Sequence, residues 1–380
     1  MHPILDTLRG YLMISRLSLS LRNGFCAAIC FAILSSTALA QSPDGPQTSA
    51  PPQADPKLQQ KAPVPQEKKP EEAGVTIAVE VPVVTIDVIA TTVNGDVIPG
   101  LKKENFRILE DGQPQSITNF APSEAPITMV LVLEFSNVFA GWFSGEAKFW
   151  ADALFPNLNQ KDWIALVTYD MKPRLEVDFT QNKDEVRQAI YHLYFPGFSE
   201  SNMFDAILDT VDRLKDVKGK KSILLLASGL DTFSKHTFDQ TLKQLRQTDV
   251  TIFAVGVDKP ITNWLEMHRS LGSMRRMDFL QGENELKTFT KMTGGFAWFP
   301  QFDGELPGIM REVAAFLRHQ YSLTYNPSNH TPDGKYRKIK VELVNPDGSP
   351  LTVVDQKGKK QKVVVYAREG YTAPKGGVGD

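Results

Sequence analysis

The sequence predicts an α/β fold, with a doubly wound, mostly parallel sheet flanked by small β-sandwich segments. The first observation is that apolar runs typical of buried strands alternate with segments of helical periodicity between residues 125 and 320. The second is that β-branched and polar residues alternate on both sides of this region, and Gly, Asn and Asp turn signals separate the runs. We therefore expect a central α/β domain between two β segments, at 74–122 and 321–374.

The central region contains the predicted elements of the α/β domain. The run Ile127-Thr-Met-Val-Leu-Val-Leu133 is apolar throughout, as expected of a strand that is covered on both faces. Further strands are predicted at 163–169, 174–179, 222–227, 250–257 and 295–299, and helices at 203–214, 236–247, 283–293 and 306–319. Alternation of strands and helices favours a parallel sheet. Residues 263–279 are predicted as an insertion, either a partner-binding loop or a solvated excursion.

The two flanking segments have the pattern of short antiparallel strands. In residues 74–122, Asn94-Gly95 is a strong hairpin signal and Glu110-Asp111-Gly112 marks a second turn. In residues 321–374, three further strands are separated by Asn-Pro and Pro-Asp-Gly turns. We expect the second segment to complete the sandwich begun by the first, with the α/β domain inserted between them. An independent C-terminal module is the alternative.

The N-terminal region, residues 1–40, is predicted to be a signal peptide. Arg16 and Arg22 precede an apolar run, and Ala38-Leu39-Ala40 is the small-x-small pattern that is cut after Ala40. An uncleaved membrane anchor is the alternative, although the run is shorter than the roughly 20 residues of a spanning helix. Residues 41–73 are rich in Pro, Gln, Ser, Lys and Glu, which predicts a disordered linker. The predicted location is therefore the periplasm or the exterior of the cell, with no transmembrane segment in the mature chain.

Composition excludes several classes of function. The chain has 42 basic and 44 acidic residues, a formal net charge of −2, so it lacks the strongly basic balance of nucleic-acid-binding proteins. Both cysteines, Cys26 and Cys30, lie in the predicted signal, so the mature chain has no disulfide, thiolate nucleophile or cysteine zinc site. The histidines show no zinc-binding spacing. Ser228-Gly229 follows a predicted strand, but the glycine two residues before a nucleophile-elbow serine is missing.

Three segments together resemble a von Willebrand factor A domain. These segments are Ile127–Val138, Ser201–Ile207 and Ser222–Asp231. The layout of residues 75–375 is similar to that of secreted "VWFA-related" proteins of the Acidobacterial type. The similarity lies in an N-terminal signature at Val84–Val88 and Val97–Gln115, and in a C-terminal one at Tyr321–Pro327, Gly334–Val341 and Ala367–Tyr371.

The resemblance implies a metal-ion-dependent adhesion site at the carboxyl ends of the strands. Such sites have Asp-x-Ser-x-Ser after the first strand, a Thr in a second loop and an Asp after the fourth strand, whose oxygens hold a cation such as Mg²⁺. In this chain the first loop reads Glu134-Phe-Ser136-Asn-Val138, the second-loop position is Ser201, and Ser228 replaces the third-loop Asp. Glu134 is about 1.5 Å longer than an Asp, and valine supplies no oxygen.

Two interpretations of this altered site stay open. In the first, the surviving oxygens of Glu134, Ser136 and Ser201, together with Asp231, bind Mg²⁺ or another divalent cation weakly. In the second, this end of the sheet binds no metal and Glu134 is a hydrogen-bonded residue of the rim. No other cofactor is predicted.

Aromatic residues after the first strand suggest a contact surface near the same rim. Trp142 and Phe143 are equally compatible with an apolar partner-binding patch and with the core, whereas Phe149 and Trp150 are expected in the core. Asn137 and Ser228 complete the predicted partner-binding set.

We therefore predict an exported, non-enzymatic adhesion protein that binds a protein or a cell-surface polymer. An envelope scaffold without a transient ligand is the first alternative. A secreted hydrolase that uses Ser228 with His236 is the second.

Overall fold

The computed structural model describes residues 83–121, 126–143, 149–193, 198–267, 273–354 and 358–375. The predicted signal peptide, the linker and the start of the predicted N-terminal β segment, up to residue 82, lie outside these residues. Among the described helices, none combines the length and the apolar character needed to cross a membrane.

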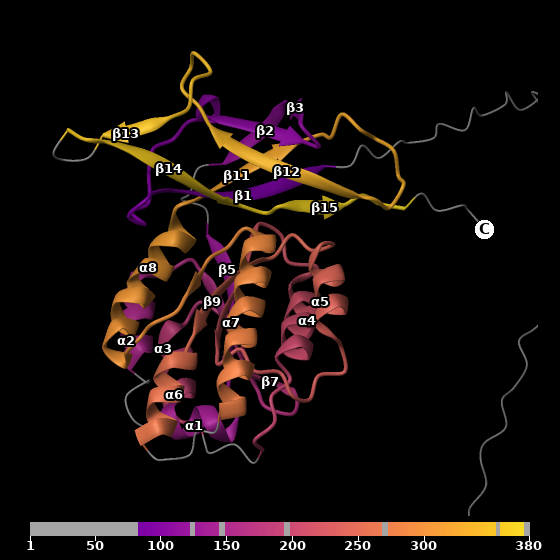
Figure 1. The fold of residues 1–380 in the computed structure, drawn as a ribbon. Coiled ribbons are helices and arrows are strands. Elements are labelled where there is room, and N and C mark those ends of the chain that lie inside the picture. Colours follow the sequence, from indigo (N-terminus) through magenta and orange to yellow (C-terminus); the bar gives the residue numbers. More distant parts are fainter. Residues whose placement is uncertain are drawn as a thin grey trace, which may run out of the picture. The chain divides into compact units, whose positions relative to one another are not determined.

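A six-stranded sheet forms the centre of the α/β domain, in the order β10-β9-β8-β5-β6-β7 (Figure 1). All neighbours are parallel except β7, which runs antiparallel to β6. The strands are β5 (Ile127–Glu134), β6 (Trp163–Tyr169), β7 (Pro173–Thr180), β8 (Lys220–Ala227), β9 (Thr251–Gly256) and β10 (Ala297–Trp298). The predicted doubly wound, mostly parallel sheet is thus confirmed.

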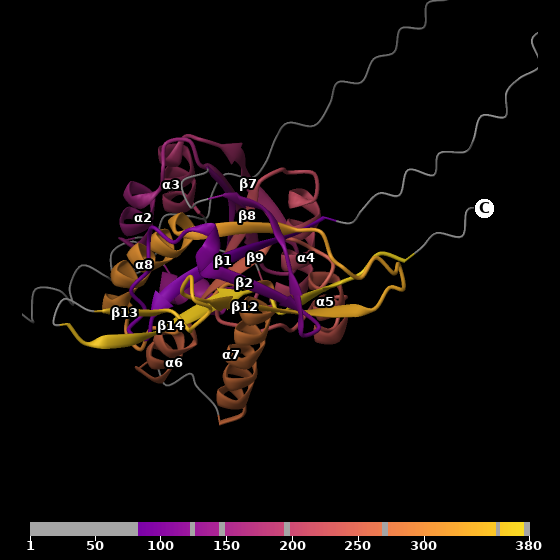
Figure 2. The same cartoon turned by 90° about the horizontal axis from the view of Figure 1, so that it is seen from above.

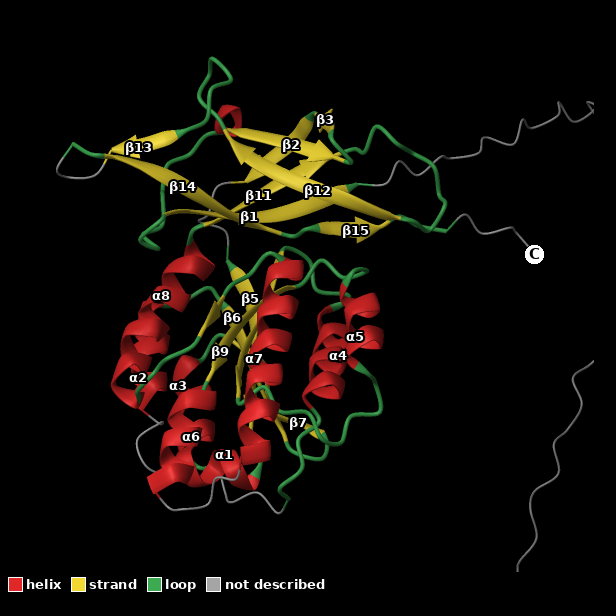
Figure 3. Ribbon diagram, viewed as in Figure 1, coloured by secondary structure: helices red, strands yellow, loops and turns green. Residues whose placement is uncertain are grey.

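Helices cover both faces of this sheet (Figure 3). Successive side chains of a strand point to opposite faces, so Met129, Leu131 and Leu133 join one core while Val130 and Val132 join the other. The first core contains residues of α1, α2, α3, α6 and α8, and the second contains residues of α4, α5 and α7. The helices are α1 (Asn137–Trp142), α2 (Phe149–Leu154), α3 (Lys183–Tyr191), α4 (Met203–Leu214), α5 (Phe238–Leu245), α6 (Asp258–Met267), α7 (Ser273–Thr293) and α8 (Leu306–Arg318). Short 3₁₀ turns occur at Lys103–Asn105, Phe155–Asn157 and Asp303–Glu305.

Strands from both ends of the described chain build two further sheets, which Figure 2 views from above. Their orders are β13-β14-β1-β11-β4 and β15-β12-β2-β3. Strand β1 pairs with β11 and β14, and β2 pairs with β12, so strands before and after the α/β domain share the same sheets. The bounds are β1 (Val84–Thr92), β2 (Phe106–Glu110), β3 (Gln113–Gln115), β4 (Ile117–Ala121), β11 (Gln320–Tyr325), β12 (Tyr336–Leu343), β13 (Thr352–Val354), β14 (Lys360–Ala367) and β15 (Gly370–Thr372).

The turn residues predicted in the flanking segments occupy positions where the backbone has a positive φ angle. Asp111 and Gly112 have φ values of 48° and 85° between β2 and β3, and Gly95 has a φ of 88° after β1. Such angles favour Gly, Asn and Asp because their short side chains tolerate the left-handed region.

The structure differs from the sequence prediction at residues 263–279. The described residues of this stretch belong to the end of α6 and the start of α7, so α7 begins at Ser273 rather than near residue 283, and residues 268–272 lie outside the described residues. The second half of α7 buries Leu286, Phe289 and Met292, whereas Met277 and Leu280 in the first half are exposed. The apolar periodicity of the sequence therefore predicts a helix only over the second half of α7, where more apolar side chains are buried. Helix α3 and the short strands β3, β13 and β15 were not predicted.

Candidate functional site

The candidate site lies where β5 and β8 end side by side. The chain leaves β5 toward β6 on one side and leaves β8 toward β9 on the other, which makes this pair the topological switch point of the sheet. Lys220, at the amino end of β8, donates from Nζ to the Gln320 carbonyl at the start of β11, 2.5 Å away. The carboxyl ends therefore lie at the other end of the domain, near α1 (Figure 1).

Glu134 is the centre of the site and is only 1 % exposed. The Ser136 hydroxyl donates to its Oε1 at 2.8 Å. The Ser228 backbone N–H and the Ser228 hydroxyl both donate to its Oε2 at 2.7 Å. One carboxylate thus joins the loop after β5 to the loop after β8 through three hydrogen bonds.

The electrostatics of Glu134 reflect two opposed effects. Burial raises the pKa of this carboxyl group because it disfavours the charged form, and the nearby charge of Asp231 acts in the same direction. Hydrogen bonds from Ser228 and Ser136 partly offset the rise. Burial likewise raises the pKa of Tyr169, at the end of β6, and the charges of Glu134 and Asp231 add to that increase.

Asp231 and Ser201 lie beside Glu134 but have other bonding roles. Asp231 Oδ2 accepts from the Phe204 N–H at 2.9 Å and from the Ser234 hydroxyl at 2.6 Å, so it holds the first turn of α4. The Ser201 backbone N–H donates to the Thr232 hydroxyl at 2.9 Å. Within the part of the chain that the structure describes, Ser201 Oγ is buried without a hydrogen-bond partner. Glu134 makes no hydrogen bond to either residue in that part.

A divalent cation does not fit this arrangement. Within the described ranges, no three acidic, His or Cys side chains are grouped so that they could hold a metal. The two oxygens of Glu134 are already engaged, and one of their partners is a backbone N–H, which cannot ligate a cation. A donor N–H aimed at the centre of the site is instead the environment of an anion. Val138 differs from the serine of the family pattern, but the structure does not describe its side chain, so this difference is known from the sequence only.

Of the two alternatives for Trp142 and Phe143, the structure supports the core and not the contact patch. Trp142 is 4 % exposed and Phe143 is 2 % exposed. Helix α1 forms here instead of a loop, and it brings both rings against Phe139, with ring centroids 5.2 and 5.6 Å apart. The Trp142 indole N–H donates to Asp303 at 2.6 Å. Asn137 does remain exposed, and its N–H donates to the Phe198 carbonyl at 2.9 Å.

The expectation that Phe149 packs in the core is wrong, because its side chain is 63 % exposed. Its neighbour Trp150 is 1 % exposed, as expected. Both residues begin the short helix α2, where successive side chains diverge by about 100°, so only one of the two rings faces the sheet.

The structure gives Ser228 and His236 separate partners. The Ser228 hydroxyl donates to Glu134, whereas His236 Nδ1 lies 2.7 Å from Asp205 Oδ1. Asp205 also accepts backbone N–H bonds from Lys235 and His236. Burial acts to raise the pKa of Asp205, but these bonds outweigh it and the pKa is lowered. Ser228 and His236 therefore do not form the serine–histidine pair of the alternative prediction.

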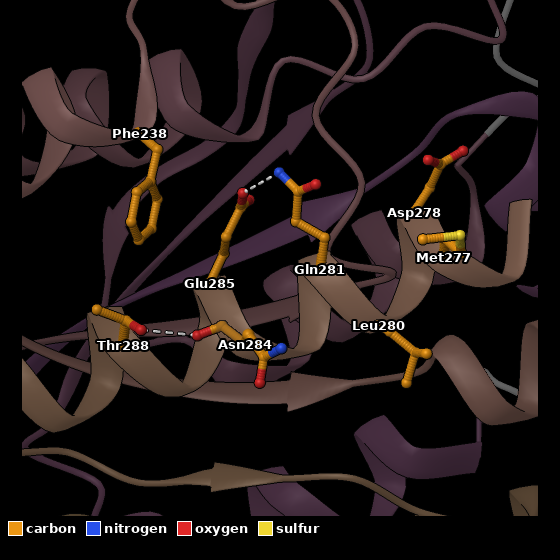
Figure 4. A pocket seen from close by; sticks show the side chains of 8 residues that line it. All are labelled: Phe238, Met277, Asp278, Leu280, Gln281, Asn284, Glu285 and Thr288. Atoms are coloured by element: carbon orange, nitrogen blue, oxygen red, sulfur yellow. Dashed lines mark hydrogen bonds between the residues drawn. The ribbon is translucent and has the colours of Figure 1, made fainter. Parts of the chain in front are cut away.

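Next to the Ser228 loop lies a groove that the sequence analysis missed. Two adjoining cavities, of about 730 and 590 Å³, share Phe238, Asp278, Gln281 and Glu285, and together we call them the α5–α7 groove (Figure 4). The larger also borders on Met277, Leu280, Asn284 and Thr288, and the smaller on Ser199, Phe204, Gly229, Leu230, Asp231, Thr232, Thr237 and Gly282. Acidic residues next to exposed apolar ones on α7 are the signal that could have found it.

Two glycines bring α7 close to the loop after β8. A Cβ atom on Gly282 would lie 2.5 Å from the Gly229 carbonyl oxygen, so only glycine allows this approach. Gly229 also has a φ of 84°, in the left-handed region. The α5–α7 groove is therefore held beside the residue that follows Ser228 in the sequence.

Comparison with known proteins identifies the domain type. The model of the von Willebrand factor type A domain matches residues 130–291. Among solved structures, a von Willebrand factor type A protein from Catenulispora acidiphila is 10 % identical over 72 % of this chain and 76 % of its own, with a TM-score of 0.40. The vWF domain of the type V pili tip protein Mfa5 from Porphyromonas gingivalis is 15 % identical over 50 % of this chain and 95 % of its own, with a TM-score of 0.37. No curated protein matches the sequence. The similarity to a von Willebrand factor type A domain therefore rests on the family model, which matches residues 130–291.

Proposed function

We propose that this chain is an exported, non-enzymatic binding protein whose von Willebrand factor type A domain recognises a protein or a surface polymer without a cation. The observation that carries the proposal is the set of hydrogen bonds from Ser136 and Ser228 to the Glu134 carboxylate. The carboxylate fills the space between the loops of β5 and β8, which a cation would otherwise join. The loops keep a defined arrangement without metal, and they border a groove that is open to a partner.

Export is the second part of the proposal and has its support in the sequence. The basic residues, the apolar run and the Ala38-Leu39-Ala40 pattern favour cleavage after Ala40 and a secreted or periplasmic protein. The similarity to secreted proteins of the Acidobacterial type is in line with this location. N-terminal sequencing of the protein recovered from the producing cell tests it, and a chain that still begins at Met1 would contradict it.

Cation independence is tested by calorimetric titration with MgCl₂, MnCl₂ and CaCl₂, together with thermal unfolding in each salt. A cation present at about a hundred times its Kd would stabilise the folded state by about 2.7 kcal/mol, which is easily detected. We expect no heat of binding and no change in the unfolding temperature at millimolar concentrations. The paired variant Glu134→Asp with Ser228→Asp, which restores the carboxylates of the family pattern, is the control in which a response is expected.

Partner binding is tested by capture from envelope extract on the immobilised chain, in EDTA and in MgCl₂. Equal recovery of a specific partner in both buffers is the expected result. Recovery only in MgCl₂ would show that a cation takes part and would overturn the proposal.

A further inference from the structure

We propose that the α5–α7 groove is the binding site for a segment of a partner protein that carries a Lys or Arg side chain flanked by apolar residues. This inference rests on the proposed function, because it names the surface and the partner chemistry through which the domain binds. It differs from a cation site in that the charge is supplied by the partner's own side chain.

The floor of the groove is aromatic. Phe238 at the start of α5 lies with its ring centroid 5.3 Å from that of Phe289 and 6.2 Å from that of Phe204. Phe204 and Phe289 are buried, but Phe238 is only half-buried and lines both cavities. Its accessible ring offers a face over which a cationic side chain can pack.

The wall formed by α7 supplies negative charge without a matching cation. Glu285 is 8 % exposed and lines both cavities, and it accepts a hydrogen bond from Gln281 at 2.8 Å (Figure 4). Burial raises the pKa of Glu285, and the charge of Asp231 across the groove raises it further. Among the residues whose side chains the structure describes, no Lys or Arg forms an ion pair with Asp231, Asp278 or Glu285.

A neighbouring glutamate of the same helix, by contrast, does have a cationic partner. Glu283 lies two residues before Glu285 on another face of α7, and its carboxylate pairs with Lys287 at 2.5 Å. No Lys or Arg occurs among the described lining residues of either cavity. A cation brought in by a partner would therefore meet several carboxylates, none of which forms an ion pair with a Lys or Arg whose side chain the structure describes.

The outer rim of the groove adds apolar contact. Met277 is 74 % exposed and Leu280 is 54 % exposed, both on the first half of α7. From Met277 to Thr288 the helix rises by about 16 Å, which an extended segment spans with about five residues. The groove thus fits a short extended segment with one basic residue over Phe238 and Glu285 and apolar residues toward the rim.

The test is selection of peptides from a display library of random segments of about twelve residues, long enough to span the groove, on the immobilised full chain. We expect the selected peptides to be enriched in Lys or Arg next to apolar residues. The consensus peptide, labelled with fluorescein, is then titrated with the chain and its variants by anisotropy. Glu285→Gln should raise the Kd about tenfold, as expected for loss of a charge-assisted contact. Glu283→Gln removes the same charge from the same helix outside the groove and should leave the Kd unchanged.

The other possible occupants give distinct results that would overturn the inference. Peptides without enrichment of basic residues, or a Kd insensitive to Glu285→Gln, would place binding elsewhere. Displacement of the peptide by MgCl₂ would indicate a metal site, and a dimer that dissociates in Glu285→Gln during sedimentation would indicate a second copy of the chain. If the peptide binds without metal and its Kd is the same in Glu285→Gln, the proposal for the α5–α7 groove is refuted but the proposed function is not. If EDTA abolishes peptide binding, the proposed function itself is refuted.

Discussion

Replacement of Glu134 gives the most direct test of how the two loops are held together. The variants Glu134→Ala and Glu134→Gln remove the same negative charge but differ in hydrogen bonding. Glutamine keeps a carbonyl oxygen that can accept from Ser228, and its amide can donate to the Ser136 hydroxyl, because a hydroxyl also accepts. Alanine leaves the Ser228 N–H without an acceptor in a buried site.

The magnitude follows from these contacts. A buried donor without a partner costs about 1–3 kcal/mol, and each hydrogen bond to a charged group contributes about 1.5–3 kcal/mol. Relief from burying a carboxylate offsets part of the loss, and the two serine hydroxyls can rotate to new partners. We expect Glu134→Ala to lower the free energy of unfolding by about 3 kcal/mol and Glu134→Gln by less than about 1 kcal/mol.

The pH dependence has a defined sign. The pKa of Glu134 is raised above its usual 4.5 in the folded protein, because burial favours the neutral form. Its contribution to stability is therefore complete below pH 4.5 and is lost as the pH rises through the folded pKa. The Gln variant does not titrate, so its stability relative to the natural protein should improve as the pH rises above 4.5.

The assay combines urea unfolding at several pH values with hydrogen exchange of the Ser228 amide. Exchange should accelerate in Glu134→Ala and stay slow in Glu134→Gln, which reports on the loop even where unfolding is not two-state. Equal destabilisation by the two variants, or unchanged protection of the Ser228 amide in Glu134→Ala, would refute the reasoning.

Three further predictions concern residues around the site. Asp258, at the start of α6, is buried, and neither of its carboxylate oxygens has a hydrogen-bond partner among the described residues, although Oδ2 lies 3.8 Å from Lys259 Nζ. Burial raises the pKa of Asp258 to about 6, and the Lys259 charge offsets part of the rise. The natural protein therefore loses stability as the pH rises through about 6, because the buried Asp258 carboxyl group becomes charged. Asp258→Asn removes this loss, so urea unfolding should show a stabilisation of up to about 3 kcal/mol at pH 8 and none below pH 3.8. Gly282→Ala should lower the free energy of unfolding by about 1–3 kcal/mol, since its Cβ would meet the Gly229 backbone, whereas Gly304→Ala, with open space around it, should not. Trp142→Phe should cost about 1 kcal/mol through loss of the indole hydrogen bond to Asp303, while peptide affinity in anisotropy titrations stays the same.

The central sheet could be predicted because its burial leaves a direct mark on the sequence. Strand β5 is covered on both faces, so Met129 to Leu133 are all apolar and wholly buried. The first half of α7 has a weaker mark, because Phe279 is buried but Met277 and Leu280 beside it are exposed. The short strands β3, β13 and β15 have three residues each, too few for an alternating pattern to be recognised.

The candidate site could be predicted in its position but not in its bonding. Strands that run parallel bring Glu134 and Ser228 to one edge, and the sequence indicates which residues follow each strand. Whether a carboxylate accepts from the Ser228 N–H or binds a metal depends on the direction of one peptide group, which no residue pattern encodes. The fate of Trp142 and Phe143 depended on whether α1 forms, and a loop and a short helix have similar sequences here.

The hydrogen bonds of Glu134 also constrain how this domain can bind. A cation with an open coordination position binds the loops of its own domain and also a carboxylate of the partner, so such a site would favour acidic ligands. Here the carboxyl group between the loops belongs to the chain itself, the charge of Asp231 acts on it, and Asp231 and Glu285 act on each other in the adjoining groove. An acidic ligand would meet repulsion at this surface, whereas a basic one would reduce the repulsion among these side chains. Under the proposed function, Glu134 in the first loop thus accounts both for binding without a metal and for a preference for basic ligands at this surface.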